Sequence, residues 1–264
     1  MSKAANNKDS LSPIDAYLDK FSRPKLTYED ISDLPTGRIA YIDTDRFTAR
    51  SLYSEKTTYD EYSTDIQQLY KVTFNDPIVM QKFATGNTKT QEQFESMVNL
   101  QSVRWAHGYP FAAFIITDND KDHDVVGYEV IGNSENVHTG ELAYLFNKAY
   151  HRSETIKDVG YENVGALCLE YGQTLFNEKR LVNQVYNQDN EKFTGGTVFT
   201  KLEATVRDDN PGSQKILEKI GGRHITNSYK FEHNRLVFEK LYDNGIVQLY
   251  DDSTMDVLGA IGGN

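Results

Sequence analysis

The fold is decided by the stretch KLEATVRDDNPGSQKILEKIGG, residues 201–222. Residues 202–206 alternate apolar and polar side chains, which predicts a half-buried strand. Asn210 is a favoured N-cap, and Pro211 suits the first helical position because its missing N–H is harmless there. An apolar stripe at 216, 217 and 220 predicts a helix, which Gly221 can end in the left-handed conformation. This order of strand, polar turn, capped helix and glycine stop predicts a βα unit of an α/β protein.

The composition predicts a globular protein. The chain has 264 residues, of which 38% are hydrophobic and 25% charged, so it suits one large domain or a domain with extensions. No apolar run approaches the roughly 20 residues that a membrane helix needs, and no apolar core follows residues 1–8. We therefore expect a cytoplasmic protein without a membrane partner.

The charge balance points to cationic partners. There are 39 acidic and 28 basic residues, a formal net charge of −11. This charge disfavours nucleic acid and favours a cationic amine, although solubility alone also accounts for an acidic chain. The single cysteine, Cys168, lies in an apolar run and is expected to pack in the core. No two of the six histidines have the spacing of ligands on one helix, so no metal site is expected.

The remaining segments can be ordered along the chain. Residues 1–40 are expected to form an N-terminal extension with a short helix near 13–21, residues 41–242 the domain, and residues 243–264 a tail. Helices are expected at 59–73 and 90–107, the second capped by Thr90. Strands are expected at 111–117 and 125–131 as an antiparallel hairpin, then at 140–146, 202–206, 224–230 and 235–241. The candidate buried positions of the second helix are Phe94, Met97, Val98, Val103 and Trp105.

Three segments carry a family resemblance. Residues 210–221 match the pattern Asn-x-x-Ser-x-x-x-Leu-x-Lys-x-Gly that follows the fifth core strand of the GNAT superfamily of N-acetyltransferases. Residues 44–52, TDRFTARSL, resemble Thr-x-Arg-Leu-x-Leu-Arg-x-Leu, the first strand of the ribosomal-protein N-terminal acetyltransferase branch. Residues 140–146, GELAYLF, resemble the Ala-Glu-Ile-Gly-Tyr-x-Leu of its fourth strand. The resemblance covers about residues 41–242, with the motifs in the family's order.

The resemblance implies a fold and an activity. The fold would be the α/β (α+β) GNAT fold, a mixed, mostly antiparallel twisted sheet flanked by helices and splayed between strands four and five. The activity would be direct acetyl transfer from acetyl-CoA to a primary amine in a ternary complex. A protein N-terminus is the first candidate acceptor, and a small polyamine or amino sugar is the second. The alternative is a non-catalytic GNAT-like module that binds acyl-CoA or another protein.

The resemblance also implies cofactor contacts. The splayed fourth strand would offer backbone groups to the pantetheine arm, and a glycine-containing helix start would face the pyrophosphate. The nearest match to that helix start is residues 157–162, where Glu162 replaces a small residue and would cost about 1 kcal/mol beside diphosphate if exposed. The implied cofactor-binding residues are Leu145, Phe146, Arg152, Lys157, Val159, Gly160, Tyr161, Asn210 and Ser213.

Two residues are candidates for the chemistry. Deprotonating an alkyl amine near neutral pH accounts for roughly 4 to 5 kcal/mol, so a general base is needed. Glu141 is the implied base, usually acting through a water, and Ser213 would lie near the cofactor sulfur. Leu217 occupies the position where other members of the superfamily have a tyrosine. Two structural alternatives stay open: Glu141 as a solvated strand residue, and Ser213 as support for the helix start.

Overall fold

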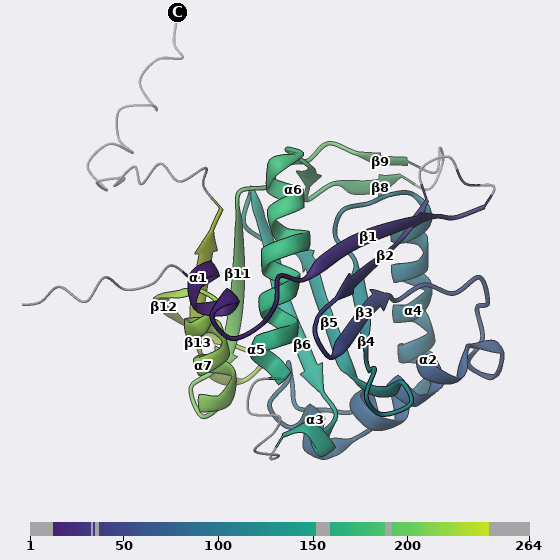
Figure 1. Ribbon diagram of the computed structural model, residues 1–264, viewed down its shortest axis with the longest axis horizontal. Helices are drawn as coiled ribbons and strands as arrows, with labels where there is room; N and C mark the ends of the chain where they lie inside the picture. The colour runs from purple at the N-terminus through teal and green to yellow at the C-terminus, as the bar shows by residue number, and fades with distance from the viewer. Residues whose placement is uncertain (1–12, 33, 35–36, 152–158, 188–191, 243–264) are drawn as a thin grey trace, which may run out of the picture.

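The computed structural model describes residues 13–32, 34, 37–151, 159–187 and 192–242. Its main sheet consists of β1 (Lys25–Asp30), β2 (Arg38–Asp43), β3 (Phe47–Ser51), β4 (Ala113–Asp118), β5 (Asp124–Asn133), β6 (Thr139–Phe146), β11 (Lys201–Arg207), β12 (Arg223–Lys230) and β13 (His233–Leu241). The order is β1-β2-β3-β4-β5-β6-β11-β13-β12, and among these strands only β6 and β11 pair in parallel. A mixed, mostly antiparallel sheet with helices on both faces confirms the predicted fold class (Figure 1).

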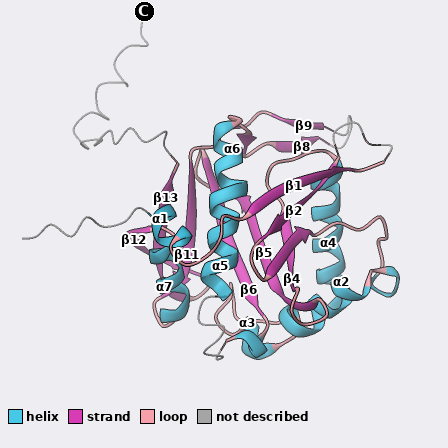
Figure 2. Ribbon diagram, in the orientation of Figure 1, coloured by secondary structure: helices cyan, strands magenta, loops and turns pink. Residues whose placement is uncertain are grey.

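Helices cover both faces of this sheet. They are α1 (Pro13–Leu18), η1 (Tyr59–Glu61), α2 (Thr64–Leu69), the π turn η2 (Tyr70–Phe74), α3 (Pro77–Met80), α4 (Gln91–Ala106), η3 (Lys148–Tyr150), α5 (Val159–Ala166), the π turn η5 (Leu167–Gly172), α6 (Gln173–Asn177) and α7 (Pro211–Lys219). The segments α5, η5 and α6 run on as one helix across the sheet (Figure 2). Two small antiparallel pairs, β7 (Leu181–Val182) with β10 (Thr197–Val198) and β8 (Val185–Asn187) with β9 (Lys192–Thr194), stand apart from it.

The predicted helix starts are confirmed. Thr90 caps α4 through a capping box with Gln93, and Asn210 caps α7 by accepting a hydrogen bond from the Ser213 N–H at 3.3 Å. Among the candidate buried positions of α4, residues 94, 98 and 105 are buried and 97 is partly buried. The prediction was wrong for Val103, whose side chain is 36% exposed. Helix α3 was not predicted; Asp76 caps it.

Two apolar layers hold the sheet between the helices. One layer packs α5, η5, α6, α7 and α1 on one face, and the other packs α2, η2 and most of α4 on the opposite face. The end of α4 joins the first layer through Trp105. Tyr17 of α1 is 1% exposed within the first layer. Strands β1 and β2 also pair with the sheet, although β1 and the first half of β2 precede the predicted domain start at residue 41. No helix among the described residues has the length and apolar character needed to cross a bilayer.

Candidate active site

The contact between β6 and β11 is short, and beyond it the two strands separate. They pair only over residues 139–141 of β6 and 201–203 of β11 within the described sheet. Beyond these pairs β6 stays with β5 as far as Phe146, and β11 stays with β13 as far as Arg207. The sheet therefore opens between its fourth and fifth core strands, as predicted (Figure 1).

Hydrogen bonds at the two ends of β6 show which peptide groups face this opening. The Asn147 N–H donates to the Val126 carbonyl at 2.8 Å, so odd-numbered positions turn toward β5 by the alternation of an antiparallel ladder. The His138 carbonyl accepts from the Thr200 N–H at 2.9 Å, so even-numbered positions turn toward β11. Peptide groups at 144 and 146 consequently lie along the opening, beyond the last β6–β11 pair at Glu141 and Glu203.

This alternation separates the two residues expected to contact a cofactor through their backbone. The peptide groups of Phe146 face the opening, whereas those of Leu145 face β5. Tyr144, which the sequence did not single out for a backbone contact, also presents its peptide groups to the opening. The Nε2–H of His151 donates to the Phe146 carbonyl at 2.7 Å and so occupies one acceptor of this edge.

Glu141 stands where the strands separate, because it and Glu203 form the last β6–β11 pair. Its side chain is half-buried. Burial raises the pKa of the Glu141 carboxyl, and the charges of Glu203 and Glu135 raise it further, while Lys230 and Arg235 act in the opposite direction. A carboxyl at the mouth of the opening with a raised pKa is suited to accepting a proton.

A tyrosine bridges the opening to the start of α7. The Tyr144 hydroxyl and the Ser213 Oγ lie 2.6 Å apart, and the hydroxyl also donates to the Ser213 carbonyl at 3.3 Å. Burial raises the pKa of the Tyr144 phenol, which keeps it neutral. The structure thus brings a tyrosine to Ser213, although the usual tyrosine position holds Leu217, which is buried. The strand motif included Tyr144, but no sequence pattern indicated this cross-opening contact.

The start of α5 packs tightly against α7. A Cβ at Gly160 would lie 2.3 Å from Cδ1 of Ile216 and 3.2 Å from the ring of Phe146, so the glycine permits this close approach. Val159 is buried in the same layer. The Tyr161 side chain points away from the opening to the N-terminal helix, with ring centroids 5.6 Å from Tyr17.

The carboxylate of Glu162 is held by the turn between β2 and β3. It accepts a hydrogen bond from the Thr44 hydroxyl at 2.5 Å and another from the Arg46 N–H. Burial raises the pKa of this carboxyl, and these two hydrogen bonds oppose the shift. Because the carboxylate is satisfied at this turn, Glu162 has a structural role that explains an acid in place of a small residue. Arg152 and Lys157 lie outside the described residues.

A loop that the sequence did not indicate borders the opening near Arg235. Arg207 Nη1 donates to the Gln81 carbonyl at 3.2 Å, and Arg235 Nη1 donates to the Ala84 carbonyl at 3.5 Å. Ala84 has φ +44°, in the left-handed region that non-glycine residues rarely adopt. The two arginines thus tie this loop to β11 and β13, on the side where Arg235 acts on Glu141.

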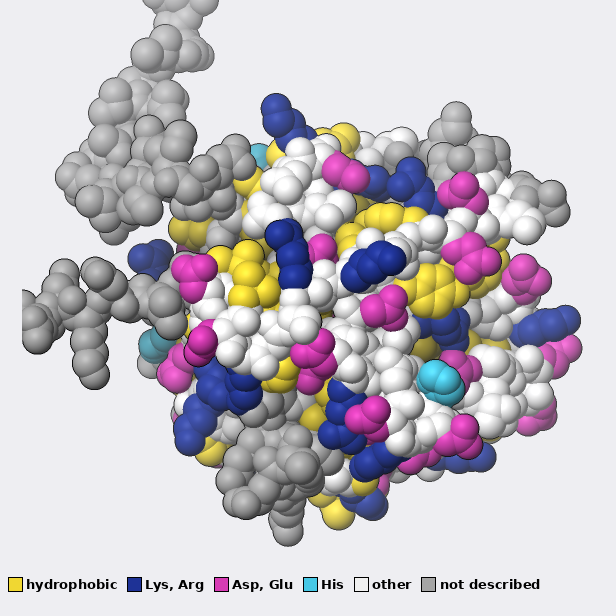
Figure 3. Space-filling view, viewed as in Figure 1, with side chains coloured by type: hydrophobic (Ala, Val, Ile, Leu, Met, Phe, Trp, Pro, Cys, Tyr) yellow, Lys and Arg dark blue, Asp and Glu magenta, His cyan; other side chains and the backbone are white. Residues whose placement is uncertain are grey.

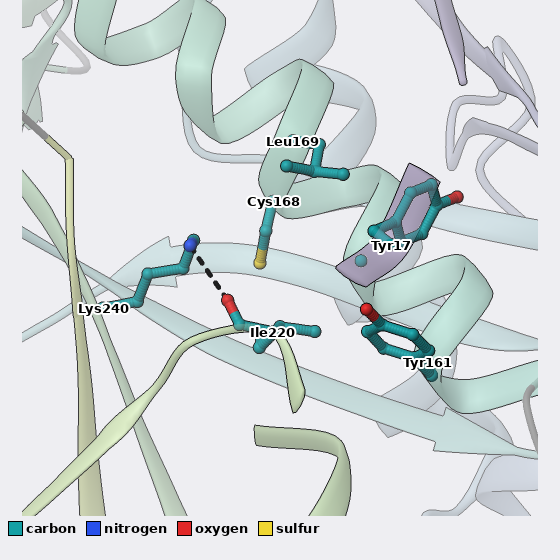
Figure 4. A pocket seen from close by; sticks show the side chains of 7 residues that line it. Tyr17, Tyr161, Cys168, Leu169, Ile220 and Lys240 are labelled. Carbon is teal, nitrogen blue, oxygen red and sulfur yellow. Dashed lines mark hydrogen bonds between the residues drawn. The ribbon is translucent and has the colours of Figure 1, made fainter. Parts of the chain in front are cut away.

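Cys168 lies in a small cavity of about 10 Å³ beneath α7, and it is buried as predicted (Figure 4). Burial raises the pKa of its thiol to about 12, so it is not a thiolate near neutral pH. Beside it, Lys240 Nζ donates to the Ile220 carbonyl at 2.9 Å at the end of α7 (Figure 4). Among the described residues no group of three or more His, Cys, Asp or Glu could hold a metal ion.

The splayed sheet, the acidic residue at its fork and the helix start beside it define an acyltransferase of the GNAT class. A model of the acetyltransferase (GNAT) domain family matches residues 60–223. That match spans more than half of the chain, so the protein belongs to this family, whose acyl donor is acetyl-CoA. A search among curated proteins finds no match.

Solved structures share the fold. An acetyltransferase of the GNAT family from Bacillus anthracis has 19% identity and a TM-score of 0.52, with 76% of this chain and 98% of that chain covered. RimL, the ribosomal L7/L12 alpha-N-protein acetyltransferase in complex with coenzyme A, has 10% identity and a TM-score of 0.52 over 75% and 96%. The microcin C7 self-immunity acetyltransferase MccE, in complex with acetyl-CoA and AMP, has 12% identity and a TM-score of 0.51 over 81% and 100%.

Proposed function

We propose that this protein transfers an acetyl group from acetyl-CoA to a primary amine, directly, in a ternary complex. The observation that carries the proposal is Glu141, a half-buried carboxyl with a raised pKa at the point where β6 and β11 part. When bound, acetyl-CoA supplies the activated thioester. The proposal assigns Glu141 as the general base that removes the proton from the amine, directly or through one water.

The acidic residues around Glu141 suit an acceptor amine in its protonated, cationic form. Glu203 is the neighbour of Glu141 across the last strand pair, and Glu135 acts on the same carboxyl. Opposite charges attract an incoming ammonium group, and the raised pKa of Glu141 makes it a better proton acceptor than an ordinary carboxylate. The surroundings of Glu141 therefore support both the binding of an amine and its deprotonation.

We assign stabilisation of the leaving thiolate to the pair Tyr144 and Ser213. Their hydroxyls are 2.6 Å apart, so with the Tyr144 hydroxyl donating to Ser213 Oγ the Ser213 proton is free to donate to the thiolate. An ordinary thiol has a pKa near 8.5, below that of a buried phenol, so full proton transfer from Tyr144 would be uphill. Hydrogen bonding to the developing negative charge is the role that this pair supports, and a proton from solvent completes the transfer.

The residues of the opening fit acetyl-CoA. The peptide groups of Tyr144 and the N–H of Phe146 would hold the amides of the pantetheine arm, as an added strand would. The start of α5 at residues 159–161 would present its N–H groups to the pyrophosphate. Asn210 and Ser213 would border the arm from α7, and Arg152 and Lys157 remain proposed phosphate contacts.

A protein N-terminus is our first proposed acceptor, and a small cationic amine is the second. The first rests on the shared fold with RimL, named for acetylating a protein α-amine. The loop tied down by Arg207 and Arg235 would then border the path of the acceptor. The cytoplasmic location predicted from the sequence stays a prediction.

The test separates binding from chemistry. Calorimetric titration with acetyl-CoA, followed by thiol release with candidate peptides and amines, should show binding and turnover in the parent protein. Glu141→Gln should keep acetyl-CoA affinity and lower turnover about a hundredfold or more. Glu55→Gln, an exposed carboxylate outside the opening, is the matched control. No acetyl-CoA binding, or no turnover of the parent protein with any acceptor, would favour the alternative of a non-catalytic interaction module. Full turnover in Glu141→Gln would instead contradict Glu141 as the base.

A further inference from the structure

A second cavity lies at the far end of the long helix. Its volume is about 240 Å³. Its lining residues include Tyr28, Arg38, Trp105, Tyr171, Leu175 and Arg180. These residues come from the β1–β2 hairpin, the end of α4 with the segment after it, and the segment from η5 to the end of α6.

This cavity is separate from the acyl-transfer opening. Leu175 lines it, whereas the opening adjoins the start of the same helix at Val159. At about 1.5 Å per helical residue the two ends lie roughly 25 Å apart. Figure 1 shows the end of α6 beside β1, at the opposite side of the molecule from α3 and the start of α5. Tyr28 and Arg38 precede residues 60–223, which match the family model.

The inner wall is made of aromatic side chains whose polar atoms are already bonded. The Trp105 indole N–H donates to the Ala113 carbonyl at 3.1 Å, and the Tyr171 hydroxyl donates to the Pro110 carbonyl at 2.7 Å. Tyr109 donates to Asn133 at 2.6 Å. These three side chains are only 2–3% exposed, so they form an apolar base with ring edges at the cavity surface, which favours an apolar group there.

The mouth, in contrast, presents unused donors. Arg38 is exposed, its guanidinium carbon lies 5.5 Å from the centre of the Tyr28 ring, and it forms no ion pair within the described part of the chain. Burial raises the pKa of Tyr28 to about 12, so its hydroxyl is a neutral donor, and that hydroxyl has no hydrogen-bond partner among the described residues. Arg180 is engaged by the Gly108 carbonyl at 2.7 Å and by Glu178. Arg38 and Tyr28 remain available to an anion.

The surface around this site carries the same two features. Figure 3 shows hydrophobic side chains between α6 and β1, with Lys and Arg side chains as well as Asp and Glu side chains beside them. In a chain of net charge −11, two arginines against one glutamate make this lining locally positive. A guanidinium beside an aromatic slot suits a carboxylate carried by a ring.

We infer that this cavity binds a small aromatic carboxylate, with the ring against Trp105 and Tyr171 and the carboxylate at Arg38 and Tyr28. The volume agrees with that ligand class. A protein cavity of about 150 Å³ accommodates benzene, so the larger volume here leaves room for a ring with a short acidic substituent. The inference does not depend on the proposed acetyl transfer.

The single tryptophan of the chain provides the measurement, because Trp105 forms part of the wall. Its fluorescence is followed in the full chain during titration with benzoate, benzamide and benzylamine, which share a ring and differ in charge. Benzoate is expected to change the emission with saturation at millimolar concentration or below, and benzylamine is not. Equal responses to all three probes, or no response to benzoate, would overturn the inference.

Two variants locate the binding. Arg38→Gln is expected to weaken benzoate binding about tenfold or more, since hydrogen bonds to charged groups are the strong ones. Lys25→Gln removes the same charge from the same hairpin at an exposed position that does not line the cavity, and it should leave affinity within about twofold. Leu175→Phe should abolish binding by filling the cavity, with unfolding temperature as its fold control. Equal effects of Arg38→Gln and Lys25→Gln, or unchanged binding in a folded Leu175→Phe, would contradict the assignment.

Discussion

The surroundings of Glu141 shift the pKa of its carboxyl in opposing directions. Burial raises its pKa most, and Glu203 adds to that effect, while Lys230 lowers it. If the ionised form is the base, turnover requires pH above this raised pKa and falls as the pH is lowered through it. The acid limb of the pH profile of kcat/KM should therefore lie above the ordinary value of 4.5.

Removing charged neighbours of Glu141 should shift the acid limb of the pH profile of kcat/KM, in a direction that depends on the sign of the charge. Glu203→Gln removes a negative neighbour and should shift the limb to lower pH, whereas Lys230→Gln removes a positive one and should shift it to higher pH. Glu55→Gln, which is not among the charges acting on Glu141, should leave the limb in place. Profiles of kcat/KM for the four proteins check this, and limbs that coincide would argue against Glu141 as the base.

The burial of Glu129 leads to a prediction about how the stability of the protein depends on pH. Glu129 is fully buried in β5, and neither carboxyl oxygen has a hydrogen-bond partner among the described residues. Burial raises its pKa well above 4.5, so above pH 4.5 the unfolded chain releases a proton that the folded chain retains. Stability should then fall as the pH rises, with a slope of up to about 1.4 kcal/mol per pH unit from this group, until the folded pKa is reached.

The variant Glu129→Gln removes this titration while nearly keeping the shape of the side chain. It should unfold at higher urea concentration than the parent at neutral pH, and at a similar concentration below pH 4.5. Urea unfolding across this range is the measurement, with the exposed Glu218→Gln as control. Parallel stability curves for parent and Glu129→Gln would show that the carboxyl is already ionised in the folded protein.

The packing of α5 on α7 depends on one glycine. Gly160→Ala would place a Cβ 2.3 Å from Cδ1 of Ile216, so the isoleucine must move, at an expected cost of about 1 kcal/mol in the free energy of unfolding. Ile216→Ala in the same chain removes the clash, and the double variant should show a coupling of at least about 0.5 kcal/mol. Gly212→Ala, whose nearest atom would be 3.8 Å away, should cost nothing. Additive effects in urea unfolding would contradict this contact.

Hydrophobic periodicity predicted the helices and strands in which one face is more buried than the other. Strand β11 alternates buried and half-buried positions, and the cap at Asn210 is a local signal, so both were predictable. Strand β1 has no such alternation, because its six residues are half-buried or exposed, and the sequence indicated an extension there. Helix α3 has four residues, too few for a helical period to be recognised.

The sequence predicted where the site lies in the sheet, but not the directions in which its peptide groups and side chains point. The motif located Glu141 at the point where β6 and β11 separate. The orientation of the β6 peptide groups, however, depends on two hydrogen bonds, from the Asn147 N–H to the Val126 carbonyl and from the Thr200 N–H to the His138 carbonyl. No local sequence pattern encodes these two bonds. The direction of the Glu162 carboxylate depends on Thr44, 118 positions away in the chain. The Tyr144 to Ser213 contact likewise joins residues 69 positions apart. Such contacts are tertiary, so the motifs alone could not reveal them.

The last prediction concerns whether residues before position 41 belong to the folded domain. The sequence places its start at residue 41, which stays a prediction, yet Tyr17 is 1% exposed and its hydroxyl donates to the Glu162 carbonyl at 3.3 Å. A Cβ at Gly165 would lie 2.7 Å from the Tyr17 ring, so α1 and α5 are in close contact. Tyr17→Ala should therefore lower the free energy of unfolding of the whole domain by about 3 kcal/mol. Tyr229→Ala, at a side chain 73% exposed, should change it by less than about 0.5 kcal/mol. If the two variants unfold at the same urea concentration as the parent, residues 1–40 are an extension that the domain does not need for its stability.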